Sequence, residues 1–268
     1  MRQVSYIIIL VLLLNSNGFS QNNNVDFIAT ERQDDWGFAI APYVLFADQA
    51  TDVGGEKIRQ SFNDLTSITN SGFQVIAGIR YKKIYFTFDG TFANLGFDDS
   101  NKALDLKLEI DQNILDFRLG YVVYENFKFD ETEILKGWSL EINSGAKYCK
   151  NNLLIQYHLN IGEEISIDDE IIEPQDWWDW MIGAKMRFIL SKKVLLGVSL
   201  SGGGFGIGNS TEFSYDFTYS NSFVISKLIL INAGFRSFKY DRIDGVAENE
   251  IKTTVNVVGP LIGVTFRL

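Results

Sequence analysis

Residues 73–94 read FQVIAGIRYKKIYFTFDGTFAN, and this stretch decides the fold class. On either side of Lys82-Lys83, every second residue is apolar, and the residues between them are small, polar or charged. Strict two-residue alternation predicts β-strands with one apolar and one polar face. A two-residue connection between two such segments predicts an antiparallel hairpin.

The same alternation recurs in ten segments of the chain. They are Trp36–Phe46, Phe73–Tyr81, Ile84–Asn94, Leu104–Tyr124, Trp138–Leu159, Trp178–Leu190, Val194–Gly208, Phe213–Ile225, Leu228–Tyr240 and Ile251–Leu268. Their apolar faces hold large residues over the full strand length, whereas their polar faces hold Gly, Ser, Thr, Asn and isolated charges. This pattern is typical of strands with lipid on one face and a polar lumen on the other. A change of apolar face between Ile110 and Leu115 predicts a β-bulge there.

We therefore predict an all-β chain that folds as a single transmembrane antiparallel up-and-down β-barrel of about ten strands, with eight as the alternative. A secreted lipocalin-like barrel is a second alternative, although it would place its apolar faces inside. Tight turns follow the second, sixth and eighth segments, and a longer turn, 125–137, follows the fourth. The long connections 47–72, 160–177 and 241–250 follow odd-numbered segments. One end of the barrel should thus carry turns and the other end loops. Aromatic residues should form girdles at both ends. One girdle would hold Trp36, Tyr81, Tyr85, Tyr124, Trp138, Phe223 and Phe266, and the other Phe73, Trp177, Trp178, Trp180 and Tyr240.

The composition argues against several classes of function. The chain has 268 residues and a formal net charge of −10, which argues against a nucleic-acid partner. Its mean hydropathy of +0.01 argues against a bundle of membrane helices. A single cysteine, Cys149, and a single histidine, His158, leave no internal disulfide and no Cys/His metal site. We expect neither a metal nor a cofactor.

The first residues predict a targeting segment. Arg2 is followed by the apolar run Ile7–Leu14 and by a polar stretch that ends in small residues, as in a secretory signal peptide. We expect residues 1–20 to be the signal peptide, with cleavage near Ser20. Residues 21–34 would form a periplasmic lead and residues 35–268 the barrel. The predicted location is the outer membrane of a Gram-negative bacterium.

Six stretches carry a family resemblance: Trp36–Tyr43 (WGFAIAPY), Ser61–Leu65 (SFNDL), Trp180–Phe188 (WMIGAKMRF), Gly203–Ser210 (GGFGIGNS), Gly234–Asp241 (GFRSFKYD) and Gly259–Arg267 (GPLIGVTFR). In this order they resemble a family of uncharacterised outer-membrane β-barrel proteins of Gram-negative bacteria. The resemblance implies an outer-membrane barrel and no established activity. Gly263, Phe266 and Leu268 resemble the C-terminal signal that the barrel-assembly machinery reads, although such barrels usually end in Phe.

The polar faces bring charges into the predicted lumen. Seven are basic and four acidic: Arg80, Asp89, Asp116, Arg118, Glu141, Lys147, Lys185, Arg187, Asp216, Arg236 and Arg267. They either form a packed ion-pair network that holds the barrel rigid, or line a path that favours anions. Ten strands leave only a narrow lumen, because barrel diameter grows with strand number.

Two of the long connections suggest further roles. Residues Lys57–Ile68 are expected to form a short helix, with Phe62, Leu65 and Ile68 on one stripe, which either plugs the lumen or lies at its mouth. The segment 160–177 holds seven carboxylates and no basic residue. It is expected to be a solvated acidic loop, and the alternative is a divalent-cation site that bridges to lipopolysaccharide.

No catalytic motif is evident. A lipid acyl-hydrolase would need a serine with a base within reach, yet only His158 and the nearby Ser166 are available, and no G-x-S-x-G motif occurs. The sequence thus favours a non-enzymatic barrel with a structural or surface-binding role and a narrow or plugged lumen. A small-solute or ion channel is the first alternative, and a lipid-modifying hydrolase is the second. The expected partners are outer-membrane lipids, lipopolysaccharide and the barrel-assembly machinery.

Overall fold

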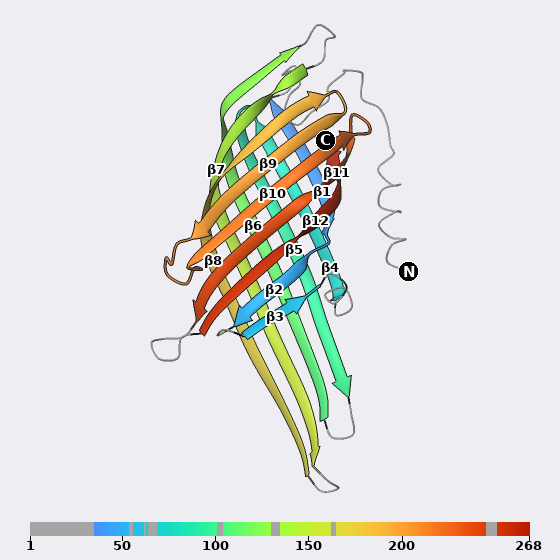
Figure 1. Ribbon diagram of the computed structural model, residues 1–268, viewed down its shortest axis with the longest axis vertical. Coiled ribbons are helices and arrows are strands. Elements are labelled where there is room, and N and C mark those ends of the chain that lie inside the picture. Colours follow the sequence, from blue (N-terminus) through green and yellow to red (C-terminus); the bar gives the residue numbers. More distant parts are fainter. Residues whose placement is uncertain are drawn as a thin grey trace.

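A computed structural model describes residues 35–53, 56–61, 63, 69–100, 104–129, 135–161, 165–244 and 251–268. These residues form an antiparallel sheet that closes on itself as a barrel of ten strands (Figure 1). The barrel strands are β1 (Trp36–Leu45), β4 (Thr69–Tyr81), β5 (Ile84–Ser100), β6 (Leu104–Phe129), β7 (Leu135–Ile161), β8 (Ile165–Ser191), β9 (Val194–Gly204), β10 (Phe213–Val224), β11 (Ile229–Asp244) and β12 (Ile251–Arg267). The predicted fold class and all ten predicted strands are confirmed. The predicted signal peptide and lead lie outside the described residues.

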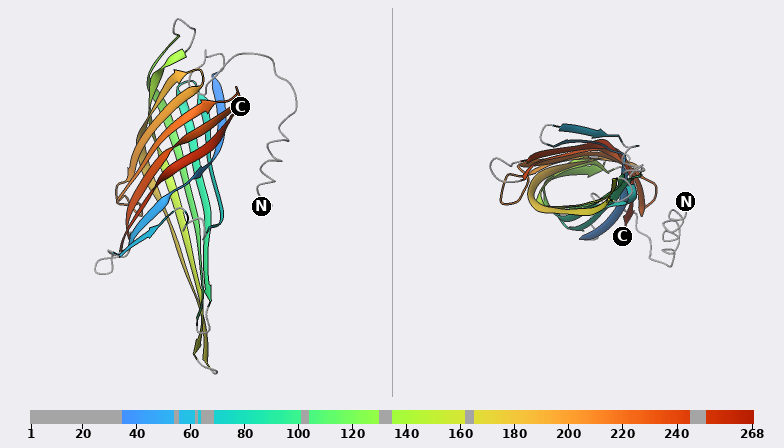
Figure 2. Two further views of the ribbon diagram at one scale, coloured as in Figure 1. Left: turned by 45° about the vertical axis from the view of Figure 1, so that its right-hand side comes forward. Right: turned by 90° about the horizontal axis from the view of Figure 1, so that it is seen from below.

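Each barrel strand pairs with the next one along the chain, and β1 closes the ring against β12. The closing register runs from Ala39 opposite Arg267 to Leu45 opposite Leu261. Viewed along its axis, the molecule is a ring of strands around an interior (Figure 2). Tight turns, the first described residue Asp35 and the C-terminal Leu268 lie at one end, which we call the turn end, and the opposite end is called the loop end.

Two further strands lie in the predicted connection 47–72, and the second of them overlaps the predicted helix. β2 (Asp48–Val53) continues the course of β1 along β12, and β3 (Glu56–Gln60) pairs with β2 as a hairpin. The prediction of a helix over Lys57–Ile68 is therefore wrong for residues 57–60. The sequence between the two strands is Gly54-Gly55, which is a hairpin signal. Phe62, Leu65 and Ile68 lie outside the described residues.

Three strands are much longer than the barrel needs. β6 has 26 residues and β7 and β8 have 27 each, whereas β9 has 11. At about 3.3 Å per residue, the longer strands run far past the shorter ones, above all at the loop end (Figure 1). Residues 165–177, expected to be part of a loop, belong to β8 and pair with β7. Likewise, the register of β6 runs unbroken through residues 110–115, and its bulge lies instead between Val122 and Tyr124.

The outer face of the barrel is apolar. Along each strand the outward side chains are large, apolar and exposed, and we call this surface the apolar belt. It includes Phe38, Ile40, Val44, Phe73, Ile79, Phe86, Leu119, Ile142, Ile182, Leu200, Ile231, Phe235 and Ile262. Aromatic pairs border it, with Trp36 against Tyr81 and Tyr124 against Trp138 at the turn end, and Tyr148 against Trp178 at the loop end.

Three residues expected in the girdles face inward instead. Tyr85, Trp177 and Tyr240 are buried, with 4%, 2% and 7% of their surface exposed. The reason is that successive residues of a strand point to opposite faces. Because Trp178 and Trp180 face outward, the adjacent Trp177 must face the lumen. In the part of the chain that the structure describes, no helix is long and apolar enough to span a membrane.

Candidate functional site: the barrel interior

The interior is a stack of layers between the two ends. At the turn end, Ile189, Leu195 and Leu230 form an apolar layer that packs against Phe127 and Val224. We call this the turn-end layer. These residues face inward because each lies on the face of its strand opposite the apolar belt. The layer covers the lumen just inside the tight turns.

A buried ion pair borders the turn-end layer. Arg187 Nη2 lies 2.5 Å from Glu141 Oε2, and both side chains are buried. The guanidinium of Arg187 also stacks on Tyr85, 4.5 Å from the ring centroid. Gly120 makes room for Glu141, because a Cβ at that position would overlap the Glu141 carboxylate. The charges of this pair are thus removed from water but neutralise one another.

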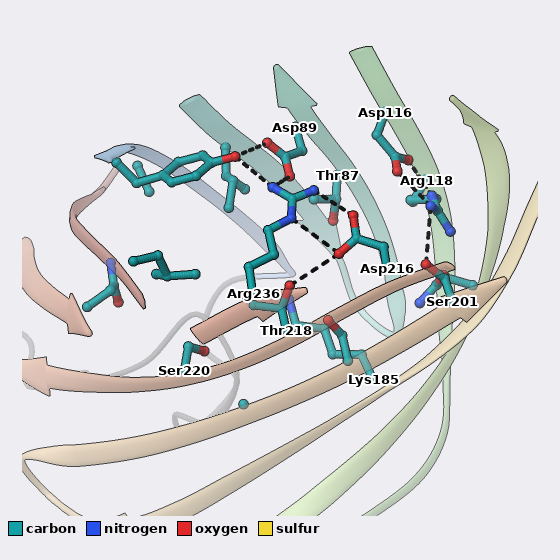
Figure 3. A pocket seen from close by; sticks show the side chains of 18 of the residues that line it. Thr87, Asp89, Asp116, Arg118, Lys185, Ser201, Asp216, Thr218, Ser220 and Arg236 are labelled. Atoms are coloured by element: carbon teal, nitrogen blue, oxygen red, sulfur yellow. Dashed lines mark hydrogen bonds and ion pairs between the residues drawn. The ribbon is translucent and has the colours of Figure 1, made fainter. Parts of the chain in front are cut away.

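Arg236 lies at the centre of a second network that crosses the lumen (Figure 3). Its Nη1 lies 2.8 Å from Asp89 Oδ2, and its Nη2 lies 2.6 Å from Asp216 Oδ2. Nη1 also donates to the Tyr43 hydroxyl at 2.7 Å, and that hydroxyl donates to Asp89 Oδ1 at 2.9 Å. These side chains come from β11, β5, β10 and β1. Together they form a fixed bar of hydrogen-bonded charges, which we call the Arg236 network.

Two more cations extend this network along the wall. Lys147 Nζ lies 3.6 Å from Asp216 Oδ2 and 3.8 Å from Asp116 Oδ2. Arg118 makes a two-point contact with Asp116 and donates to Ser201 Oγ at 3.4 Å. Asp116, Lys147 and Asp216 are all buried. Every carboxylate in this part of the lumen therefore has at least one cationic partner.

A second apolar layer lies towards the loop end. It consists of Cys149, Trp177, Tyr240 and Val255, with Phe238 and others packed against it. We call it the loop-end layer. Cys149 is 3% exposed there.

The turn between β9 and β10 is anchored close to this layer. Asp179 accepts hydrogen bonds from the Thr211 backbone N–H at 2.8 Å and from its hydroxyl at 2.9 Å, and both side chains are almost completely buried. Arg242 stacks on Trp177 and donates to the Asn209 carbonyl at 3.2 Å. The turn is thus attached to the barrel by a carboxylate and a guanidinium.

Between the Arg236 network and the turn-end layer is a cavity of about 310 Å³, which we call the polar chamber. Hydroxyl and amide groups cover much of its wall, including Thr87, Ser199, Thr218, Ser220 and Asn232. Lys185 also lines it, and in the described part of the chain its ammonium group has no hydrogen bond or ion pair. The chamber and the layers around it contain five cations and four carboxylates: Arg118, Lys147, Lys185, Arg187, Arg236, Asp89, Asp116, Glu141 and Asp216. Lys185 is the cation in excess.

The structure places all eleven charges listed from the sequence on the inner face of the barrel. Nine of them make up the two networks and the polar chamber, and Arg80 and Arg267 lie nearer the turn end. The candidate assembly residues lie on the closing strand, where Gly263 faces Tyr43 and Phe266 faces Ile40. Leu268 is 84% exposed. The side chains of His158, Ser166 and the carboxylates at 163–173 lie outside the described residues.

Several residues of the interior were not singled out from the sequence. Tyr43, Ser201 and Asp179 hold the networks and the turn in place, yet each reads as an ordinary residue of an alternating strand. Parity could have found Tyr43, since it lies between the outward Pro42 and Val44. Among the described residues, no group of Cys, His, Asp and Glu side chains is arranged to hold a metal ion.

No family model and no curated protein matches this sequence. Solved structures similar in shape include the outer membrane protease OmpT from Escherichia coli, with 9% identity over 87% of this chain and 97% of that chain and a TM-score of 0.48. The attachment invasion locus protein Ail of Yersinia pestis has 10% identity, the same coverage and a TM-score of 0.32. Neisserial surface protein A has 11% identity, again with 87% and 97% coverage, and a TM-score of 0.29. At these scores the likeness carries no conclusion about function.

Proposed function

We propose that this protein is a closed outer-membrane β-barrel that does not conduct and that acts as a structural or binding element of the cell surface. The apolar belt supports the membrane location, because a closed sheet satisfies its backbone in lipid and needs apolar outward side chains. The observation that carries the closed state is the Arg236 network. It connects four strands across the lumen, between two apolar layers.

The long strands support a role at the surface. β5 to β8 continue past the loop end as an antiparallel sheet, which no closed barrel requires (Figure 1). With the turn end towards the periplasm, this sheet would project from the cell. Lipopolysaccharide and outer-membrane lipids are the partners nearest to it, and the barrel-assembly machinery is the partner that we propose for insertion.

Single-channel recording in planar bilayers tests the closed state. We expect no conductance steps from the intact protein, and none from a variant that lacks Asp52–Asn70, because the layers that fill the lumen lie elsewhere in the chain. Steps from the intact protein would overturn the proposal. Steps from the deletion variant alone would show that the 52–70 segment, and not the Arg236 network, blocks the lumen.

An anion-selective path is the second candidate, and Lys185 is the observation that favours it. This lysine is the surplus positive charge of the polar chamber, and a fixed cation in a narrow path favours anions. If steps do occur, a KCl gradient should show anion preference, and Lys185→Gln should reduce it. Anion preference that is unchanged in Lys185→Gln would exclude this role for Lys185.

A further inference from the structure

The barrel wall is not uniformly closed by backbone pairing. β1 pairs with β4 from Trp36 opposite Tyr81 to Tyr43 opposite Gln74, and there the pairing stops. Just beyond, the Leu45 backbone N–H donates to the Gln74 side chain, with the nitrogen 2.8 Å from Oε1. A side chain therefore satisfies the first backbone group that the neighbouring strand no longer reaches.

Beyond this point the two sides of the wall follow different partners. The chain continues as β2 along β12. Among the described residues, β3 pairs only with β2, and the part of β4 before Gln74 pairs only with β5. In the described part of the sheet, no register joins β3 to β4. We call the line between them the seam. Figure 2 shows β2 and β3 leaving the ring at this side of the barrel.

A cavity of about 640 Å³ lies at the seam. It is lined by the inward-facing side chains of Tyr43, Phe238 and Val257 and also by the outward-facing side chains of Val44, Phe73 and Ile262. Among the described residues, inward-facing and outward-facing residues of the wall therefore border the same cavity. We call it the lateral cavity.

The mouth of the lateral cavity lies at the level of the apolar belt. Val44, Phe73 and Ile262 are 51%, 53% and 53% exposed, and all three belong to that belt. In a membrane this mouth would meet hydrocarbon rather than water. The side walls are also apolar, since Phe238 and Val257 are continuous with the loop-end layer.

The floor of the lateral cavity is polar. Lys147, Asp216 and Arg236 of the Arg236 network line it. Arg118, Asp89 and Asp116 belong to the same network without lining the cavity, and the three cations and three carboxylates of the whole network neutralise one another. Uncharged amides and hydroxyls, including Gln49, Gln112 and Thr91, lie on the surrounding wall. Such a floor matches a head group that donates and accepts hydrogen bonds without bringing a charge.

We propose that the lateral cavity binds a single-chain amphiphile with an uncharged hydroxylated head, of the monoacylglycerol class, which enters sideways from the membrane. The acyl chain would lie between Phe73, Ile262 and Val257, and the head would reach Tyr43 and Gln112. The volume lies within the roughly 300–1,000 Å³ of small-molecule sites. This site goes beyond the proposed surface role and rests only on the proposed membrane location.

Photolabelling tests the site. The protein, in phosphatidylcholine vesicles, is irradiated with a monoacylglycerol that carries a diazirine on its chain, and the adducts are mapped by peptide mass spectrometry. We expect adducts at the outward Ile262 and also at the inward Phe238 and Val257. Val257→Trp fills the cavity and should lower the inward labelling about tenfold, which corresponds to about 1.4 kcal/mol. Val258→Trp is the matched control, because it places the same ring on the outer face of the same strand.

A second cavity-filling variant, Ala93→Leu, should also lower inward labelling, and it guards against misfolding of Val257→Trp. Adducts on the belt alone would overturn the proposal and leave the membrane location intact. An absence of adducts even at Ile262 would refute the membrane location, and the proposal with it. Inward labelling that persists in both filled variants, or that a fatty acid displaces better than unlabelled monoacylglycerol, would also overturn it.

Discussion

Arg187 and Glu141 lie 2.5 Å apart in a part of the barrel where neither side chain reaches solvent. Removal of one partner leaves the other as a buried charge without its counterion. We therefore expect Arg187→Met to lower the free energy of unfolding by about 3–5 kcal/mol. Urea unfolding of the protein in lipid vesicles, followed by tryptophan fluorescence, measures this change.

Lys192→Ala is the control for the Arg187 variant, because Lys192 is exposed in the turn between β8 and β9. It should change the free energy of unfolding by less than about 0.5 kcal/mol. A similar small change in Arg187→Met would show that the ion pair does not hold the turn end together.

Replacement of Lys147 and of Lys185 by methionine should have different effects on the free energy of unfolding. Lys147 has two carboxylate partners, so Lys147→Met should destabilise the barrel by about 3–5 kcal/mol. Lys185 has no such partner among the described residues, and Lys185→Met removes a cation that is repelled by Arg187 and attracted only at longer range by Glu141 and Asp89. We expect that variant to be as stable as the wild type or about 1 kcal/mol more stable. Equal losses in both variants, measured by the same urea titration, would contradict the surplus role of Lys185.

Trp177 and Trp178 are adjacent in sequence and lie on opposite faces of β8. Trp177 is 2% exposed in the loop-end layer, whereas Trp178 is 54% exposed on the outer face. Trp177→Ala should lower the free energy of unfolding by about 3–5 kcal/mol, because it empties a packed site. Trp178→Ala should cost less than about 1 kcal/mol. A larger loss for Trp178 would mean that the faces of β8 are assigned the wrong way round.

The contacts of Asp241 predict that the local stability of the loop end decreases in acid. It lies past the apolar belt, accepts a hydrogen bond from Thr254 Oγ1 at 2.6 Å and pairs with Lys239 at 2.9 Å. Burial acts to raise the pKa of its carboxyl, but the hydrogen bonds from Thr254 and Lys239 outweigh it and hold the pKa below the ordinary value of 3.8.

A lowered pKa in the folded state gives stability that is present above the unfolded value and lost as pH falls through the folded one. The protection factor of the Thr254 amide, which compares its exchange rate with that of the unfolded chain at the same pH, should therefore fall below about pH 4. Asp241→Asn should exchange fast already at neutral pH and respond less to acid. An Asp241 carboxyl that titrates above 3.8 would refute this assignment.

Strand parity explains how much of this fold could be read from the sequence. The ten barrel strands could be predicted from the alternation of apolar and polar residues, because each strand has one face towards lipid and the other towards the lumen. Beyond the belt this constraint disappears, and residues 165–177 therefore looked like a polar loop although they pair in β8. In the same way, the three-residue spacing of Phe62, Leu65 and Ile68 outweighed the hairpin signal at Gly54-Gly55.

The interior pairs were beyond the reach of the sequence. Alternation groups charges on one face but does not give the stagger between distant strands. Arg236 meets Asp89 only because the ring brings β11 near β5, which lies far from it in the chain. Trp177 illustrates a different error, since its position near a strand end was given more weight than its parity.

The pairing of Ala39 with Arg267 affects the order in which the barrel folds. This contact joins the first barrel strand to the last, so its loop-closure entropy exceeds that of every hairpin in the ring. Hairpins such as β6–β7 need only neighbouring chain and can form early. An intermediate that lacks the closing contact is an open, curved sheet with two unpaired edge strands, β1 and β12. Until β1 and β12 pair, the unpaired backbone groups of these two edges can bind a strand of another chain.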